Sequence, residues 1–121
     1  MTTNSNTFIR KGDIILVDFK KNEGSEQNGV RPALVVQNNK GNTFSPTTIV
    51  CPLTSQCKGM DATHVVLLPE ECGILKPSVV LCEQVRVIDK SRIRKKIGCI
   101  ISSCKLAAVD QTMLLSFGID A

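Results

Sequence analysis

Aromatic side chains are scarce in this sequence, which has four Phe and neither Tyr nor Trp. Stacking of successive bases on aromatic platforms therefore cannot be a main binding mode of the chain. Only one histidine is present, His64, which excludes a nuclease that uses two imidazoles as its general acid and base. Long apolar runs are also lacking, and the N-terminal MTTNSNTFIRKG has no apolar core of a signal peptide. These absences predict a cytoplasmic protein without membrane contact.

Familiar metal patterns are missing as well. None of the six cysteines forms a C-x-x-C pair, and a single histidine cannot complete a common zinc pattern. Most of the cysteines stand beside apolar residues, as in IVCPL and VVLCEQV. In a reducing compartment such residues serve as small hydrophobes. We therefore predict no metal and no cofactor, and free thiols at Cys51, Cys57, Cys72, Cys82, Cys99 and Cys104.

The rest of the composition is that of one globular domain, since the 121 residues are 42% hydrophobic and 21% charged. Residues 1–9 are polar and predict a flexible N-terminus, which leaves 10–121 as the domain. The formal net charge of +4 would help to bind a phosphate backbone but does not establish such binding.

Apolar and β-branched segments predict a mostly β structure. The first of them is apolar on both faces, which suits a closed or two-layered β structure. Five strand segments are expected, at 13–19, 33–37, 47–53, 63–68 and 78–88. The last is a long strand or a bent pair, with Gln84 and Arg86 on one face and Glu83 and Val85 on the other.

The C-terminal part of the sequence predicts helical structure. Asp89 is placed to cap a helical turn at 90–94, and Ser102 or Ser103 to cap a helix through Phe117. The apolar face of that helix is formed by Leu106, Val109, Met113, Leu114 and Phe117. The predicted fold is mainly β with a C-terminal helix, as a small SH3-like barrel.

The stretch GSEQNGVRPALVVQ, residues 24–37, leads from a polar loop into a strand. Gly24 and Gly29 allow the loop to turn with positive φ. Arg31 carries a planar guanidinium suited to a phosphate. Pro32 restricts Arg31 to extended conformations and requires a first or edge place in a strand. On composition alone, a hairpin loop with a solvated Arg31 is the simpler interpretation.

Five segments in order settle that choice: RKGDIILVDF, GSEQNGVRPALVVQN, FSPTTIVCPLTSQ, THVVL and LCEQVRVIDKSRI. From Arg10 to about Phe117 the chain resembles the MazF/PemK family of toxin endoribonucleases from type II toxin–antitoxin systems. The resemblance implies an SH3-like barrel in a homodimer, formed by 10–121 as a single toxin endoribonuclease domain. It also implies sequence-specific, metal-independent cleavage of single-stranded RNA and neutralisation by a MazE-like antitoxin.

The resemblance also implies site residues. The catalytic arginine of the family matches Arg31, and its catalytic threonine or serine matches Thr54. Glu26 lies in the GSEQ loop that lines the RNA groove and is a candidate base. Polar side chains from this loop, from the EQV segment and from neighbouring positions are expected to bind RNA. These are Ser25, Gln27, Asn38, His64, Glu83 and Gln84.

In the implied chemistry, the 2′-hydroxyl of RNA is the nucleophile, so that no metal-activated water is required. Arg31 would clamp the charge that develops on the phosphoryl oxygens, and Thr54 would donate its hydroxyl to one of them. The general base stays open. Glu26 is either the base or a structural loop acid, and His64 is either an acid or base or a polar side chain of a half-buried strand.

Two other classes of function are alternatives. One is a non-catalytic toxin barrel of the same fold that poisons a protein target. The other is a barrel that binds DNA and RNA alike and releases no product. The pair of Arg31 and Thr54 favours catalysis, because a pure binding protein needs neither residue.

Overall fold

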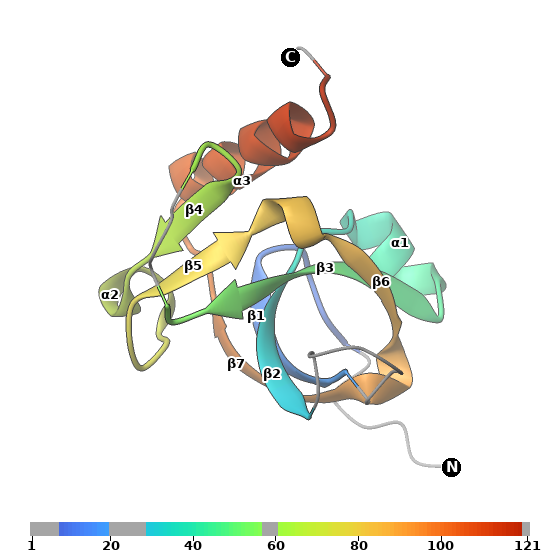
Figure 1. The fold of residues 1–121 in the computed structure, drawn as a ribbon. Coiled ribbons are helices and arrows are strands. Elements are labelled where there is room, and N and C mark those ends of the chain that lie inside the picture. The colour runs from blue at the N-terminus through green and yellow to red at the C-terminus, as the bar shows by residue number, and fades with distance from the viewer. Residues whose placement is uncertain (1–7, 20–28, 57–60, 120–121) are drawn as a thin grey trace.

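The three-dimensional structure is a computed structural model that describes residues 8–19, 29–56 and 61–119 (Figure 1). The described strands are β1 (Asp13–Asp18), β2 (Val30–Val35), β3 (Thr47–Thr54), β4 (His64–Leu67), β5 (Ser78–Leu81), β6 (Arg86–Asp89) and β7 (Ile93–Cys99). The helices are α1 (Asn39–Phe44), α2 (Pro69–Cys72) and α3 (Ser103–Ser116), with 3₁₀ turns η2 (Cys82–Gln84) and η3 (Lys90–Arg92). None of these helices is long and apolar enough to cross a membrane.

The strands form one strongly curved antiparallel sheet in the order β4-β5-β3-β2-β1-β7, and β6 also pairs with β3 (Figure 1). Between the described residues of β6 and β7 there is no ladder, and η3 joins the two strands instead. The sheet therefore curls like an SH3-like barrel without closing by hydrogen bonds. A mainly β fold with a C-terminal helix, as predicted, is confirmed.

The central strands β1, β2 and β3 bury both of their faces, as the apolar first segment predicted. Ile15, Ala33 and Val50 belong to the core inside the curled sheet. Ile14 and Leu34 point the other way, into a second core that α3 covers with the buried Val109. Leu106 and Met113 also pack there, whereas Phe117, expected on the same face, is 52% exposed. Two cores back to back make β1–β3 the rigid centre of the molecule.

Strand β3 pairs with both β5 and β6 along the same edge, and the register differs between these two pairings. Leu53 lies opposite Val80 of β5, and continuing that register places Cys51 opposite Cys82. Val50, the residue before Cys51, lies opposite Arg86 of β6 and not opposite residue 83, as the β5 register would require. Residues 83–85, which are the last two residues of η2 and Val85, are therefore extruded from the sheet. The predicted bent pair is observed, but the predicted alternation of faces through Glu83 and Gln84 is wrong, because these residues are not in a strand.

Besides η2, three described elements were not predicted: helix α1, strand β7 and the short helix α2, which lies in a segment expected to be a connection. Helix α1 lies in the segment expected to be a turn-rich connection, and the buried Asn42 fixes it by accepting hydrogen bonds from Thr48 Oγ1 (2.7 Å) and Gln37 Nε2 (3.0 Å). Strand β7 follows a helical turn that covers only residues 90–92, shorter than expected. Gly98 of β7 is required by a close approach, since a Cβ there would collide with the carbonyl oxygen of Cys72.

The described cysteines are free thiols, as predicted, but they are not all buried. Cys51, Cys72 and Cys82 are buried, Cys99 is half-buried and Cys104 is exposed. A hydrogen bond to the Cys82 thiol and burial together raise the pKa of Cys51 far above its ordinary value. Cys57 lies outside the described residues.

Candidate active site

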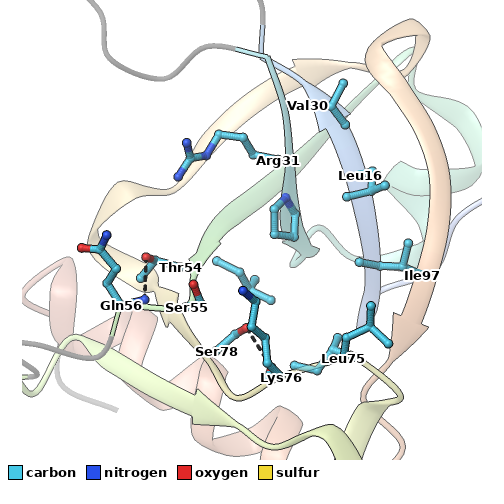
Figure 2. A pocket seen from close by; sticks show the side chains of 13 residues that line it. Leu16, Val30, Arg31, Thr54, Ser55, Gln56, Leu75, Lys76, Ser78 and Ile97 are labelled. Carbon is cyan, nitrogen blue, oxygen red and sulfur yellow. Dashed lines mark hydrogen bonds between the residues drawn. The ribbon is translucent and has the colours of Figure 1, made fainter.

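An open pocket of about 400 Å³ lies at the end of the ladder between β2 and β3 (Figure 2). The two strands pair from Val35 opposite Val50 to Ala33 opposite Pro52, and the ladder stops there. The residue before Ala33 on β2 is Pro32, which has no N–H group with which to extend the ladder. If the same register continued, Arg31 would lie opposite Thr54. Arg31 and Thr54, two of the three residues predicted to be catalytic, therefore line one pocket from adjacent strands.

The position of Arg31 is fixed by backbone structure on both sides. It is the second residue of β2 and lies opposite Val17 of β1. Before it, Gly29 turns the chain with a φ of 72°, a value that favours glycine, and its carbonyl accepts the N–H of Phe19 at 3.1 Å. Among the described residues, no carboxylate lies within salt-bridge distance of the Arg31 guanidinium. The cation is thus held in place and is available to an anion.

Thr54 ends β3 and lies opposite Val79 of β5. Its Oγ1 accepts the backbone N–H of Gln56 at 3.1 Å (Figure 2). A hydroxyl that accepts from the backbone keeps its own proton to donate elsewhere. Because Thr54 lines the pocket, its hydroxyl retains a proton that it can donate to a group bound there.

The remaining polar lining was not foreseen from the sequence. It consists of Ser55, Gln56, Lys76 and Ser78. Ser55 and Gln56 directly follow Thr54. A threonine at the end of a strand often accepts the backbone N–H two residues on, so this turn could have been recognised in the sequence. Lys76 carries no such signal, because only the pairing of β5 with β3 brings it to the pocket. The described lining holds two cations and no carboxylate, which suits a phosphate.

A second polar cluster gathers at the start of β4 and at η2. His64 is 11% exposed, its Nε2 lies 3.4 Å from Oε1 of Glu83, and its Nδ1 accepts the N–H of Asp61 at 3.4 Å. Gln84 Nε2 donates to Glu83 at 3.4 Å, and the Thr63 hydroxyl, which donates to Oδ1 of Asp61 at 2.6 Å, lies 3.3 Å from Oε1 of Glu83. The structure thus brings together three of the residues expected to bind RNA. In the described part of the chain, no three His, Cys, Asp or Glu side chains gather closely enough to hold a metal ion.

The cluster is separate from the pocket but lies on the same sheet. His64 is opposite Leu81 of β5, two residues from Val79, which pairs with Thr54. Two strand spacings and two residues along a strand place the Cα atoms of His64 and Thr54 about 12 Å apart. One phosphate cannot span that distance, whereas a strand of several nucleotides can. The Thr63 hydroxyl and N–H also lower the pKa of Asp61, which keeps this acid ionised.

The other expected residues are not in either group. Asn38 lies past the end of β2 that is remote from Arg31, and its side-chain oxygen caps α1 by accepting the N–H of Gly41 at 2.8 Å. Ser25, Glu26 and Gln27 lie outside the described residues.

Comparisons with known proteins agree on one family. Residues 10–117 match the family described as PemK-like, MazF-like toxin of type II toxin–antitoxin system. A protein of Staphylococcus epidermidis, Endoribonuclease MazF, is 40% identical over 113 residues, which cover 93% of each chain. The solved structure of MazF from Deinococcus radiodurans is 28% identical with a TM-score of 0.76, over 92% of this chain and 97% of that one. A MazE–MazF structure from the same organism is 29% identical with a TM-score of 0.72, over 93% and 97% of the chains.

Proposed function

The chain belongs to the PemK-like, MazF-like toxins of type II toxin–antitoxin systems, and we propose that it is an endoribonuclease that cuts single-stranded RNA at specific sequences and is neutralised by a cognate antitoxin. The observation that carries this proposal is the presence of Arg31 and Thr54 in one cationic pocket whose described lining contains no carboxylate. A protein that only binds a partner has no need of an arginine and a threonine hydroxyl in the same cationic pocket. We also propose a cytoplasmic location, because single-stranded mRNA is the proposed substrate.

The proposed reaction is a transesterification. The 2′-oxygen attacks the adjacent phosphorus, the bond from phosphorus to the 5′-oxygen breaks, and a 2′,3′-cyclic phosphate and a 5′-hydroxyl result. One proton leaves the 2′-hydroxyl for a base, and one proton reaches the departing 5′-oxygen. Because the substrate supplies the nucleophile, the step requires no metal-bound water.

Arg31 and Thr54 stabilise the charge that develops on the phosphoryl oxygens. The guanidinium offers two parallel N–H groups to two oxygens, and the Thr54 hydroxyl donates to one of them. Both donors are held by strands before the substrate arrives, so little reorganisation is needed during the reaction. For the base we propose Glu26, the candidate that the first loop offers, to take the proton of the 2′-hydroxyl.

The cluster around Glu83 and Gln84 is proposed to read the bases that flank the cut. Both side chains are exposed on the extruded segment, where they can meet the edges of splayed bases. The Nε2 of His64 contacts the Glu83 carboxylate at 3.4 Å and helps to fix its position. Ser25 and Gln27 are proposed to add contacts from the first loop. Asn38 is left out of the site, because its oxygen caps α1 at the other end of β2.

The partners follow from the same pocket. The solved MazE–MazF structures of Deinococcus radiodurans hold a toxin with its antitoxin. For this chain we expect an extended acidic segment of the antitoxin to place carboxylates near Arg31 and to compete with RNA. We also propose that the protein acts as a homodimer, as the family resemblance implies.

The test is incubation of the purified protein with a long RNA in excess EDTA, followed by sequencing of the new ends. We expect cleavage at a short preferred sequence, with 2′,3′-cyclic phosphate ends, and no cleavage of a substrate with 2′-deoxyribose at the cut. Arg31→Ala should abolish most activity, while the matched control Arg10→Ala, an exposed arginine at the other end of β1, should not. Binding without product, or cleavage of the deoxy substrate, would refute the proposal.

A further inference from the structure

The loop between α2 and β5 brings a second cation into the pocket of Arg31 and Thr54. Figure 2 shows Arg31 at the upper side of the pocket, Lys76 at the lower side and Thr54 between them. Arg31 comes from β2, whereas Lys76 stands two residues before β5. A phosphate bound to the Thr54 hydroxyl would therefore have a cation on each side.

The backbone that carries Lys76 is anchored at both ends. On one side, Gly73 ends α2 with its N–H donating to the carbonyl of Pro69 at 2.8 Å, and Ile74 is buried in the core under α3. On the other side, the hydroxyl of the buried Ser78 donates to the carbonyl of Lys76 at 3.2 Å. The lysine is thus presented by fixed backbone, although its neighbour Leu75 is 98% exposed.

No described carboxylate neutralises Lys76. Three other lysines of the described chain form ion pairs, Lys11 with Asp110, Lys96 with Asp13 and Lys105 with Glu71. For Lys76 no such partner lies within salt-bridge distance among the described residues, and the described lining of the pocket contains no acid. Its ammonium is therefore available to the substrate.

The reaction needs a proton donor for the departing 5′-oxygen, and the described lining offers few. Arginine holds its proton too firmly to transfer it. His64 lies about 12 Å from Thr54 by strand spacing and is engaged by Glu83. Among the described residues that line the pocket, an ammonium is then the one group that combines positive charge with a transferable proton.

We propose that Lys76 is the general acid of the endoribonuclease proposed above, on which this inference rests. As the bond between phosphorus and the 5′-oxygen breaks, the electron pair stays on that oxygen, and the oxygen takes a proton from Nζ of Lys76. The neutral amine then regains a proton from water. The proton of the 2′-hydroxyl goes to a separate base, so the two transfers balance.

The test compares two RNA substrates that differ at one atom, with either oxygen or sulfur as the 5′ leaving atom at the cut. A thiolate leaves without protonation, so loss of a general acid should matter only for the oxygen substrate. We expect Lys76→Ala to slow cleavage of the oxygen substrate by about 10²–10⁴-fold and to leave cleavage of the sulfur substrate within about tenfold of the unmodified protein. Lys76→Arg should not restore the oxygen rate, because arginine keeps the charge but not the transferable proton.

Lys40→Ala is the matched control, an exposed lysine on α1 at the far end of β2, and should cut both substrates normally. Melting curves check folding, and Lys76→Met, which keeps the length of the side chain, replaces the alanine variant should that variant unfold. Normal cleavage of the oxygen substrate by a folded Lys76 variant overturns the inference and leaves the proposed function standing. Equal slowing of both substrates, or rescue by arginine, overturns the acid role in favour of a simple phosphate contact. Absence of cleavage by the unmodified protein overturns the proposed function itself.

Discussion

Replacement of Thr54 by valine removes one hydroxyl from the pocket and keeps the shape of the side chain. In the structure, that hydroxyl accepts the Gln56 N–H at 3.1 Å and has its proton free for a phosphoryl oxygen. Loss of one preorganised donor of this kind typically lowers kcat by about 10²–10³, or about 2.7–4 kcal/mol of transition-state stabilisation. Because the donor acts mainly on the transition state, kcat should fall much more than KM rises.

The same substitution should change the fold little. The pairing of Thr54 with Val79 is made by the backbone, and valine is as favourable as threonine in a strand. The exposed hydrogen bond from Gln56 contributes at most about 0.5–1.5 kcal/mol, which corresponds to a few degrees in Tm. Thr54→Ser keeps the hydroxyl and should retain activity within about tenfold, as a serine at the equivalent place can make both hydrogen bonds.

The assay is single-turnover cleavage of a short RNA with one cut site, measured beside a thermal melt of each variant. A Thr54→Val protein that melts normally and cuts within threefold of the unmodified protein would show that the hydroxyl takes no part in the reaction. A Thr54→Ser protein as slow as the valine variant would show that shape, and not hydrogen bonding, is what the position supplies.

Three further outcomes are expected. Asn42→Ala should lower the free energy of unfolding in urea by about 1–3 kcal/mol, because it leaves the hydroxyl of the fully buried Thr48 without its acceptor, and an unchanged value would contradict this contact. Iodoacetamide should modify the exposed Cys104 of the native protein and spare Cys51, as measured by mass spectrometry. Cys51 is buried, and its hydrogen bond to Cys82 raises the pKa of its thiol, so that little reactive thiolate forms. Faster modification of Cys51 than of Cys104 would contradict the structure. A backbone N–H at the start of α2 lowers the pKa of Glu71, so its stabilisation is present above the ordinary pKa of about 4.3 and is lost as pH falls through the lower folded value. Melts between about pH 2 and 6 should therefore depend less on pH for Glu71→Gln, and an unchanged pH dependence would count against this contact.

The central strands could be predicted because their residues are β-branched and apolar on both faces, which few other structures accommodate. The same local evidence placed Arg31 at the start of β2 beside Pro32. Helix α1 could not be predicted, since NKGNTF contains a glycine and weak helix formers. It is held by the Asn38 cap and by the buried contacts of Asn42 with Thr48, and the latter exist only in the folded chain.

Strand β7 and Lys76 were missed for related reasons. The segment IRKKIGC exposes three consecutive basic residues, 94–96, at an outer strand, so the alternation that marks a half-buried strand is absent. Lys76 lies in a connection 22 positions after Thr54, and the two meet only because β5 pairs with β3. Sequence patterns report local periodicity, whereas both features depend on which strands become neighbours.

The change of register along β3 has a consequence for how such a protein can evolve. Glu83 and Gln84 stand on a segment that neither β5 nor β6 uses for pairing, and both side chains are exposed. Substitutions there leave the core and both ladders intact, so they cost the fold little. Under the base reading proposed above for Glu83 and Gln84, selection could alter which bases are preferred without changing the strands that hold Arg31 and Thr54. In that case, the RNA sequence preference could change through substitutions in the extruded segment, while the residues of the pocket stay the same.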